Sequence, residues 1–535
     1  MNHVTAPVAP TASGASRREL ARFAVGLVLL VIAVLFLSRG WVLFTRPLWV
    51  DEWFTVLVAS HASPVDVIAD LRHGADGGAG LFHLLVWGLR AVTGELSPVA
   101  LRAMSLIFML GALCFAYAVL RRRFSRDATV VGVLAVGSHS LVVAHAFEGR
   151  FYGLWLLCCA MYAWSLGVSR RRDLSVAIAA ILLTSSHWYG IISLALMSGA
   201  AVVAHGRAWR QGIRLVIPSA AGAVTLLAIA PLARGQRAAV TVNSWIADFD
   251  IGQIRGLANL FWVAAVPFIA AIVLLVALYL RQSSHVRPEH GETTRVILSE
   301  PGIVALASLG LMPLALAMVS AAGLPSMIGR YSLPAALAWA PLAALAAALL
   351  TRWSARTFAI VLIVFWLSSY AREAARQRAF DFGVRHERDL VASAVTSGLP
   401  IVFQSLHTMY PSLAATRGAG AKVSFLDLPD STLRALFPVE SRYYQINKGV
   451  TLERDFARVH AARFGFPKLV SQATLDTTTR FLFVATAVRI PTGVGDATAL
   501  AREVFPHHRV VALTEDLLLL ERPSASSHPA RNTSR

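Results

Sequence analysis

The sequence is poor in charged residues and in cysteine. Only 15% of its 535 residues are Asp, Glu, Lys or Arg, against roughly 25% in an ordinary soluble chain, and 56% are hydrophobic. The three cysteines, Cys114, Cys158 and Cys159, all fall inside apolar runs, so no disulfide framework is implied. These shortages exclude an ordinary soluble protein and a disulfide-stapled domain, and they predict a membrane protein.

Acidic residues are scarcer than basic ones, with 30 Asp and Glu against 49 Lys and Arg, and the formal net charge is +19. Such an excess is also found in proteins that bind nucleic acid. Here, however, the positive residues are almost all Arg and stand in short clusters between apolar runs. This pattern follows the positive-inside rule for membrane proteins, so we expect no nucleic-acid partner.

Long apolar runs are abundant, and about 20 apolar residues are enough for a helix to cross a hydrocarbon core of about 30 Å. The sequence predicts a polytopic α-helical membrane domain over 1–371, with about eleven transmembrane helices. The predicted spans are 22–44, 99–119, 128–146, 151–168, 174–187, 190–204, 213–232, 257–280, 301–322, 332–350 and 357–371.

The arginines orient these spans. With residues 1–18 as a cytoplasmic tail before an uncleaved first helix, eighteen arginines lie on the cytoplasmic side and nine on the other. The odd number of spans then places the chain beyond 371 outside the cytoplasm. In an alternative interpretation, 174–204 is one long helix that includes the polar HWYG segment. The number of spans is then even, and the chain beyond 371 lies in the cytoplasm.

The composition changes near 372, where charged residues return. Short β-type runs at 399–404, 421–426, 479–486, 508–513 and 516–521 alternate with helical ones at 385–397, 450–463 and 496–504. The pattern predicts a small, soluble, extracytoplasmic α/β domain over 372–522, followed by a disordered tail, 523–535. Its helices lack a phosphate-binding glycine motif and metal-ligand spacing, so we expect a structural or acceptor-binding role.

The first extracytoplasmic loop, 45–98, opens with RPLWVDEWFT. If Pro47 starts a helix, Trp49 and Trp53 share one face and Asp51 points about 200° away from Trp49. Asp51 is therefore our candidate catalytic base. Glu52 lies nearer the aromatic face and is expected to hold a helix end or a cationic partner, and we include it in the catalytic pair. The alternative is an interfacial aromatic anchor with solvated carboxylates.

A second polar cluster is AHAFEGRFYG at the end of the third span, with Glu148, Arg150 and Tyr152 as candidate substrate-binding residues. Charges at a bilayer edge are usually functional or paired. All three side chains converge only if Gly149 and Gly153 allow an irregular turn. The alternative is an ion pair between Glu148 and Arg150 that holds a tight loop.

Two more clusters add candidate substrate-binding residues on the same side. SSHWYG contains His187 and Tyr189, and a single histidine there is more often a hydrogen-bonded core residue than a ligand. GLPSMIGRYSLP places Arg330 and Tyr331 at the start of the tenth span, where the planar guanidinium suits a phosphate. The alternative for Arg330 is a snorkelling interfacial residue.

Four polar clusters from distant parts of the chain thus fall at one depth on one side of the membrane. An acid that abstracts a proton, together with cations that hold an anionic leaving group, suits transfer from a lipid phosphate. A divalent metal near Glu52 or Glu148 is compatible with the sequence but is not required by it.

The order of these elements resembles the GT-C glycosyltransferases, specifically the bacterial branch of the dolichyl-phosphate-mannose protein mannosyltransferase superfamily. The resemblance covers roughly 40–370. It includes RPLWVDEWFT, the segment LFHLLVWGLRAVTGELSPVALRAMSLIFMLGALCFAYAVLRRRF, AFEGRFYGL, SHWYG and GRYSLP. One departure is GADGGAGLFH at 74–83, where the family usually has a Pro-Pro-Leu-Tyr-like segment; His83 stands there in place of an aromatic residue.

The resemblance implies an inverting transferase that takes a hexosyl or pentosyl group from a polyprenyl-phosphate donor. It implies Asp51 as base, with Glu148 and Arg150 as the Glu and Arg of the family's EaRmY turn. The acceptor would be an envelope glycan, lipid or protein, reached from the outer face of the inner (plasma) membrane. Alternatives from other classes are a transporter or flippase for lipid-linked sugars and a structural assembly factor that docks through its C-terminal domain.

Overall fold

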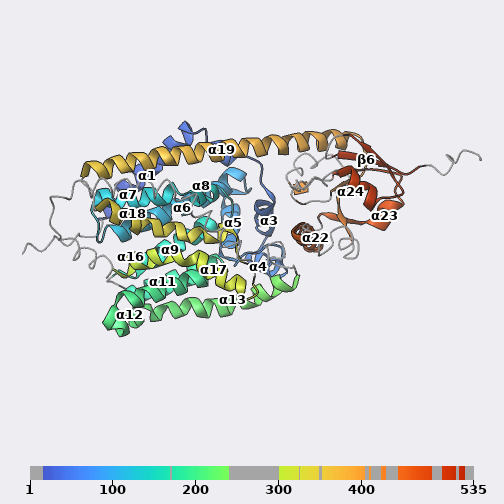
Figure 1. Cartoon of the computed structure of the whole chain (residues 1–535). Coiled ribbons are helices and arrows are strands. Elements are labelled where there is room, and N and C mark those ends of the chain that lie inside the picture. The colour runs from blue at the N-terminus through green and yellow to red at the C-terminus, as the bar shows by residue number, and fades with distance from the viewer. Residues whose placement is uncertain are drawn as a thin grey trace, which may run out of the picture.

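The computed structural model describes residues 16–168, 171–239, 300–324, 326–348, 352–403, 406, 409–410, 423–428, 444–464, 466–484, 497–513 and 517–523. Figure 1 shows a helical bundle with a smaller sheet-containing domain at one end. The predicted span 257–280 and nearly all of the predicted tail 523–535 lie outside the described residues.

The bundle is made of apolar helices whose starts the sequence marks clearly. Ser16, Ser97 and Ser125 each accept a backbone N–H of the following turn and so begin α1, α6 and α7. The helices and 3-10 turns are α1 (Arg17–Leu37), α2 (Val42–Thr45), α3 (Val50–Val58), α4 (Pro64–Arg72), α5 (Leu81–Thr93), α6 (Pro98–Leu120), α7 (Arg126–Gly137), α8 (Ser140–His145), α9 (Tyr152–Ser165), α10 (Arg172–Ser186), α11 (Gly190–Ala204), η1 (Gly206–Ala208), α12 (Trp209–Val216), η2 (Ile217–Ser219), α13 (Ala220–Ala239), α16 (Pro301–Ser308), η4 (Leu309–Leu311), α17 (Met312–Ala321), η5 (Gly329–Ala338), α18 (Trp339–Ala348) and α19 (Arg352–Thr396).

Six helical stretches of the described chain are long and apolar enough to cross a membrane: Arg17–Leu37, Pro98–Leu120, Trp209–Ala238, Pro301–Ala321, Gly329–Ala348 and Ala355–Arg378. Except for 257–280, the remaining predicted spans coincide with shorter helices. A multi-pass helical membrane protein is thereby supported, and the count of eleven spans stays a prediction.

The segment 174–204 forms two helices, α10 and α11, and the chain leaves helical geometry at His187 between them. The alternative of one long helix is therefore wrong. His187 has extended backbone angles, and its ring accepts the backbone N–H of Tyr189 at 3.0 Å. A side chain that bonds the backbone two residues on competes with the helical ladder, which explains the break.

Arginines predicted on the cytoplasmic side meet acidic partners at the bundle end where α6 finishes and α1 begins. Arg121 donates to Glu19 at 2.7 Å, and Arg122 contacts Glu300 at 3.2 Å. These pairs lie at the other end of α6 from the acidic loop 45–98. The predicted orientation of the two ends across a membrane stays a prediction.

The C-terminal part contains a six-stranded sheet with the order β3-β2-β1-β4-β6-β5. Strand β1 pairs in parallel with β2 and β4, β3 is parallel to β2, and β6 is antiparallel to β4 and β5. Five strands match the predicted runs, whereas β3 was not predicted because its two end residues are exposed and only its two central residues are half-buried. The elements are β1 (Ile401–Phe403), β2 (Val423–Asp427), α22 (Tyr444–Phe464), β3 (Lys468–Ser471), α23 (Gln472–Asp476), β4 (Arg480–Val484), α24 (Ala497–Val504), β5 (Arg509–Ala512) and β6 (Leu517–Glu521).

Helix α19 joins the bundle to the sheet. Its 45 residues span roughly 70 Å at 1.5 Å per residue, and Figure 1 shows it running along the bundle and on to the sheet domain. The helix continues through residues 371 and 372, so the predicted domain boundary coincides with a change of composition and not with a helix end. The same helix therefore belongs to both parts.

Candidate active site

The acidic loop begins with a helix that is capped by its own glutamate. Helix α3 starts at Val50 with Trp49 as its cap, not at Pro47 as expected, and Glu52 accepts the Trp49 N–H at 3.2 Å. The carbonyls of Arg46 and Pro47 instead accept N–H groups of Arg102, at 2.5 and 2.9 Å. These carbonyls are thereby withdrawn from helical hydrogen bonding, which moves the helix start by three residues.

Glu52 is fully buried and bound on both oxygens. Arg102 donates to its Oε1 at 2.9 Å and to its Oε2 at 2.5 Å, and the Gly149 N–H donates at 2.8 Å. The expectation that Glu52 holds a helix end and a cationic partner is confirmed. Arg102, which the sequence did not single out, also has no exposed surface. These contacts suit a positioning role, and a chemical role for Glu52 stays a prediction.

The aromatic face of α3 is covered by the sheet domain. Val50 and Phe54 belong to one buried cluster with Tyr410, and Trp49 and Trp53 pack against it. Trp53 and Tyr410 stack with their ring centroids 6.1 Å apart. The partner of this face is therefore protein, and the interfacial-anchor alternative is wrong.

Asp51 points to Arg330. The Asp51 Oδ2 atom and Arg330 Nη1 lie 3.2 Å apart, and the two side chains remain 20% and 19% exposed. Arg330 is the second residue of η5, whose first turn begins at Gly329, so the expected helix start is confirmed. Its guanidinium also lies 5.8 Å from the ring centroid of Tyr331. Asp51 and Arg330 thus form an ion pair that solvent still reaches.

Arg150 makes a different pair, with Asp76. Its Nη1 and Nη2 donate to the two carboxylate oxygens at 2.5 and 2.9 Å, and Nη1 also donates to the Asp51 carbonyl at 2.7 Å and to Thr55 at 2.8 Å. Three of these four N–H···O contacts are made by Nη1 and one by Nη2, and the side chain is 5% exposed. The alternative of an ion pair between Glu148 and Arg150 is wrong, because Asp76 takes that place.

Asp76 and His83 were not predicted as site residues. His83 lies 2.8 Å from the second oxygen of Asp76, and both side chains are buried. Burial acts to raise the pKa of the Asp76 carboxyl, but Arg150 and His83 more than offset it, and the pKa lies well below its usual range. The sequence signal that could have identified Asp76 is a single acid among the small residues of GADGGAG. Small neighbours allow a carboxylate to be buried against a cation.

Glu148 pairs with His145, at 2.8 Å. Residues 146–151 form the irregular turn that the sequence predicted. A Cβ atom on Gly149 would lie 2.3 Å from Leu101, and one on Gly153 would lie 2.5 Å from the Ser105 carbonyl oxygen. The two glycines are thus needed for close approach to α6. Among the described residues no group of three or more His, Cys, Asp or Glu side chains is placed to hold a metal ion.

An aromatic shell surrounds this polar centre. The ring of His187 stacks on Trp155 at 4.0 Å and lies 5.6 Å from Tyr331 and 6.3 Å from Tyr152. Tyr189 lies 4.9 Å from Tyr331 and donates to Ser326 at 2.6 Å. His187 is 5% exposed and hydrogen-bonded, as the core interpretation expected. All four predicted clusters therefore converge on one place, and their roles toward a substrate stay predictions.

The arrangement of spans, acidic loop and appended sheet is shared with a membrane protein of known structure. The chain is similar to ArnT from Cupriavidus metallidurans bound to undecaprenyl phosphate, with a TM-score of 0.52, 12% identity and coverage of 94% of this chain and 99% of that one. The apo state of the same protein gives a TM-score of 0.55, 12% identity and coverage of 93% and 98%. No known family profile and no curated protein matches the chain. The predicted GT-C resemblance is thus confirmed at the level of fold.

Proposed function

We propose that this chain is an integral membrane glycosyltransferase that moves a sugar from a polyprenyl-phosphate donor to an extracytoplasmic acceptor, with inversion at the anomeric carbon. The acceptor is a glycan, lipid or protein of the envelope. The fold shared with ArnT, whose structure holds undecaprenyl phosphate, supports a lipid-phosphate donor. On this proposal the site and the sheet domain face outward from the plasma (inner) membrane.

The observation that carries the proposal is the partly exposed pair of Asp51 and Arg330. Of the other charged residues near it, Glu52, Arg102 and Arg150 are 0%, 0% and 5% exposed and are bound to protein partners. Glu148 is 15% exposed and pairs with His145. Asp51 and Arg330 combine an acid and a cation in contact with each other and with solvent. Transfer from a phosphate needs these two groups.

We assign the donor phosphate to Arg330. Both terminal nitrogens of Arg150 already bind oxygens of Asp76, Thr55 and the α3 backbone, so Arg150 serves to position α3. An incoming phosphate competes with Asp51 for the Arg330 guanidinium, because phosphate and carboxylate bind the same planar fork. Donor binding would therefore loosen the ion pair and leave the Asp51 carboxylate to act on the acceptor.

In the reaction, the acceptor hydroxyl oxygen attacks the anomeric carbon from the face opposite the phosphate and passes its proton to Asp51. The bond between the anomeric carbon and the phosphate oxygen breaks, and its electron pair stays on that oxygen. The polyprenyl phosphate that leaves carries one more negative charge than it did in the donor. Arg330 stabilises this charge, so the leaving group needs no proton.

The test uses the full-length protein in detergent, with hexosyl and pentosyl polyprenyl phosphates as donors and an envelope extract as acceptor. Release of polyprenyl phosphate and labelling of the extract should both occur in the wild type. Asp51→Asn removes the proton acceptor at nearly constant volume and should lower turnover by roughly 10²- to 10⁴-fold. Glu95→Gln, an exposed acid of the same loop, is the matched control.

Wild-type turnover by Asp51→Asn would overturn the base assignment. Movement of the intact donor across a liposome membrane, without release of polyprenyl phosphate, would show a flippase instead. The mass of the envelope glycan in a strain that lacks the protein provides the matching test in cells, because the missing mass shows whether the transferred sugar is a hexose or a pentose.

A further inference from the structure

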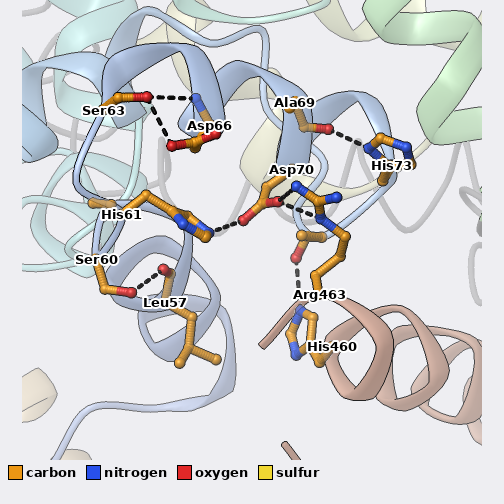
Figure 2. A network of polar contacts seen from close by, with 12 residues as sticks. Leu57, Ser60, His61, Ser63, Asp66, Ala69, Asp70, His73, His460 and Arg463 are labelled. Carbon is orange, nitrogen blue, oxygen red and sulfur yellow. Dashed lines mark hydrogen bonds and ion pairs between the residues drawn. The ribbon is translucent and has the colours of Figure 1, made fainter. Parts of the chain in front are cut away.

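Helix α22 of the sheet domain contacts the acidic loop directly. Figure 2 shows Arg463 and His460 of α22 directed toward the short helix α4 and the residues that follow it. Arg463 donates to Asp70, whose other oxygen contacts His61, and Asp70 has no exposed surface. A carboxylate this buried costs free energy unless it is paired, and Asp70 is paired on one oxygen by Arg463 and on the other by His61.

His460 connects two parts of the loop. Its Nε2 lies 2.8 Å from the Ala75 carbonyl, and its Nδ1 contacts the Tyr410 hydroxyl. Since a carbonyl only accepts, Nε2 carries the proton and donates to Ala75, and Nδ1 accepts from Tyr410. Tyr410 packs edge-on against Phe54, with 5.7 Å between the ring centroids, and the His460 ring itself lies 4.6 Å from that of Phe54. One buried histidine therefore contacts both the 70–76 segment and helix α3.

The contacts continue from Ala75 into the site. The next residue, Asp76, holds Arg150, and Arg150 donates to the Asp51 carbonyl at 2.7 Å. The chain of contacts therefore runs from His460 through Ala75, Asp76 and Arg150 to Asp51. Each link is a hydrogen bond or a covalent neighbour, and the glycines around Asp76 provide little rigidity of their own.

We propose that α22 is a positioning element for the membrane site, in which His460 and Arg463 hold the 70–76 segment so that Asp76 keeps Arg150 fixed against Asp51. The effect on catalysis rests on the proposed function, whereas the ordering of the segment does not. Helix α19 connects the sheet domain to the bundle without a break, which supports the contact of α22 with the loop.

Two arginines of α22 provide a matched comparison. Arg463 pairs with Asp70 of the loop, whereas Arg458 pairs with Asp427 of β2, inside the sheet domain, at 2.8 Å. Arg463→Gln and Arg458→Gln each remove one partly exposed arginine of the same helix. Only the first breaks a contact with the loop. Arg463→Lys, which keeps the charge, should retain part of the wild-type protection of the 70–76 segment from hydrogen exchange.

Hydrogen exchange in the full-length protein measures the ordering without any substrate. The backbone N–H groups of Gly74, Ala75 and Gly77 donate to Leu71, Asp70 and Asp76, so their exchange reports on the segment. Arg463→Gln and His460→Phe should speed this exchange, and Arg458→Gln should not. His460→Gln, whose amide can still donate to Ala75, should be milder than His460→Phe. Equal exchange in Arg463→Gln and Arg458→Gln would overturn the proposal.

Transfer assays on the same variants test the catalytic half. Arg463→Gln should lower kcat by roughly ten- to hundredfold with a smaller change in KM, because a small misplacement of the site affects the chemical step more than binding. Arg458→Gln should stay within about twofold of wild type, within the usual range for exposed pairs. If the wild type uses no lipid-linked donor, the proposed function fails. The exchange data alone then decide whether α22 holds the 70–76 segment in place. If His460→Phe does not fold, the arginine pair carries the test.

Discussion

The carboxylate of Asp51 and the guanidinium of Arg330 lie 3.2 Å apart although 279 positions of the chain separate them. Asp51 belongs to the loop helix that follows the first span, and Arg330 begins the helix η5 of a much later one. Their contact brings a candidate base and a candidate phosphate ligand together. Arg150, the other candidate phosphate ligand, is instead 5% exposed and paired with the buried Asp76.

Substitution of Arg330 should weaken donor binding. Arg330→Ala removes a charge-assisted contact of about 1.5–3 kcal/mol, so binding of undecaprenyl phosphate should weaken roughly ten- to hundredfold. Arg330→Lys keeps the charge but loses the planar fork, so it should bind more weakly than wild type and retain some transfer. Arg330→Gln should not rescue binding. Titration of undecaprenyl phosphate by intrinsic fluorescence measures these affinities.

The control for this series is Arg376→Gln, since the Arg376 side chain is 79% exposed and is predicted on the same side of the membrane. It should bind like wild type. Unchanged affinity in Arg330→Ala would move the phosphate to Arg150 and make Arg330 an interfacial anchor.

Glu52→Gln should act on stability more than on chemistry. The change breaks a fully buried ion pair and leaves Arg102 without its anionic partner, which costs about 3–5 kcal/mol. The melting temperature in detergent should fall clearly, whereas transfer per folded molecule should fall less than in Asp51→Asn. Glu95→Gln should change neither quantity. A loss of transfer in Glu52→Gln equal to that of Asp51→Asn, at unchanged stability, would give Glu52 the chemical role.

Topology can be tested with single cysteines in a variant that lacks Cys114, Cys158 and Cys159. Ala473→Cys in the exposed helix α23 should react with an impermeant maleimide added to intact cells. Asp173→Cys, exposed at the predicted cytoplasmic end, should react only after permeabilisation. Labelling of both sites, or of Asp173→Cys alone, in intact cells would contradict the outward placement of the sheet domain.

Acid should loosen the contact between the sheet domain and the loop. Burial lowers the pKa of His460 from 6.5 to about 4, against the opposing influence of the hydrogen bond to Ala75 and of the charges of Asp76 and Asp70. As the pH falls, His460 therefore binds a proton in the unfolded chain at a higher pH than in the folded protein. The stability that neutral His460 contributes is complete above about pH 6.5 and is lost as the pH falls toward 4, by at most about 3 kcal/mol. His460→Gln should show a flatter decline of melting temperature in this range, and an identical decline would contradict the assignment.

Much of the site could be predicted because it depends on local chemistry. Acidic residues after an apolar span, and an arginine at a helix start, are visible in the order of residue types. The partners were harder to predict, since Arg102 looked like one more residue of an apolar helix and Asp76 like part of a flexible glycine-rich loop. Burial decides their roles, and burial depends on what the rest of the chain places around them.

Residue order alone determined the membrane class, the apolar helices and most strands of the sheet, because hydrophobic run length and periodicity act over a few turns. Only the tertiary structure decided which cation pairs with which acid, and that the aromatic face of α3 meets the sheet domain. Those outcomes depend on contacts between segments hundreds of residues apart. Such pairings are set by packing, since an arginine in an apolar interior pairs with whichever carboxylate the fold places within reach.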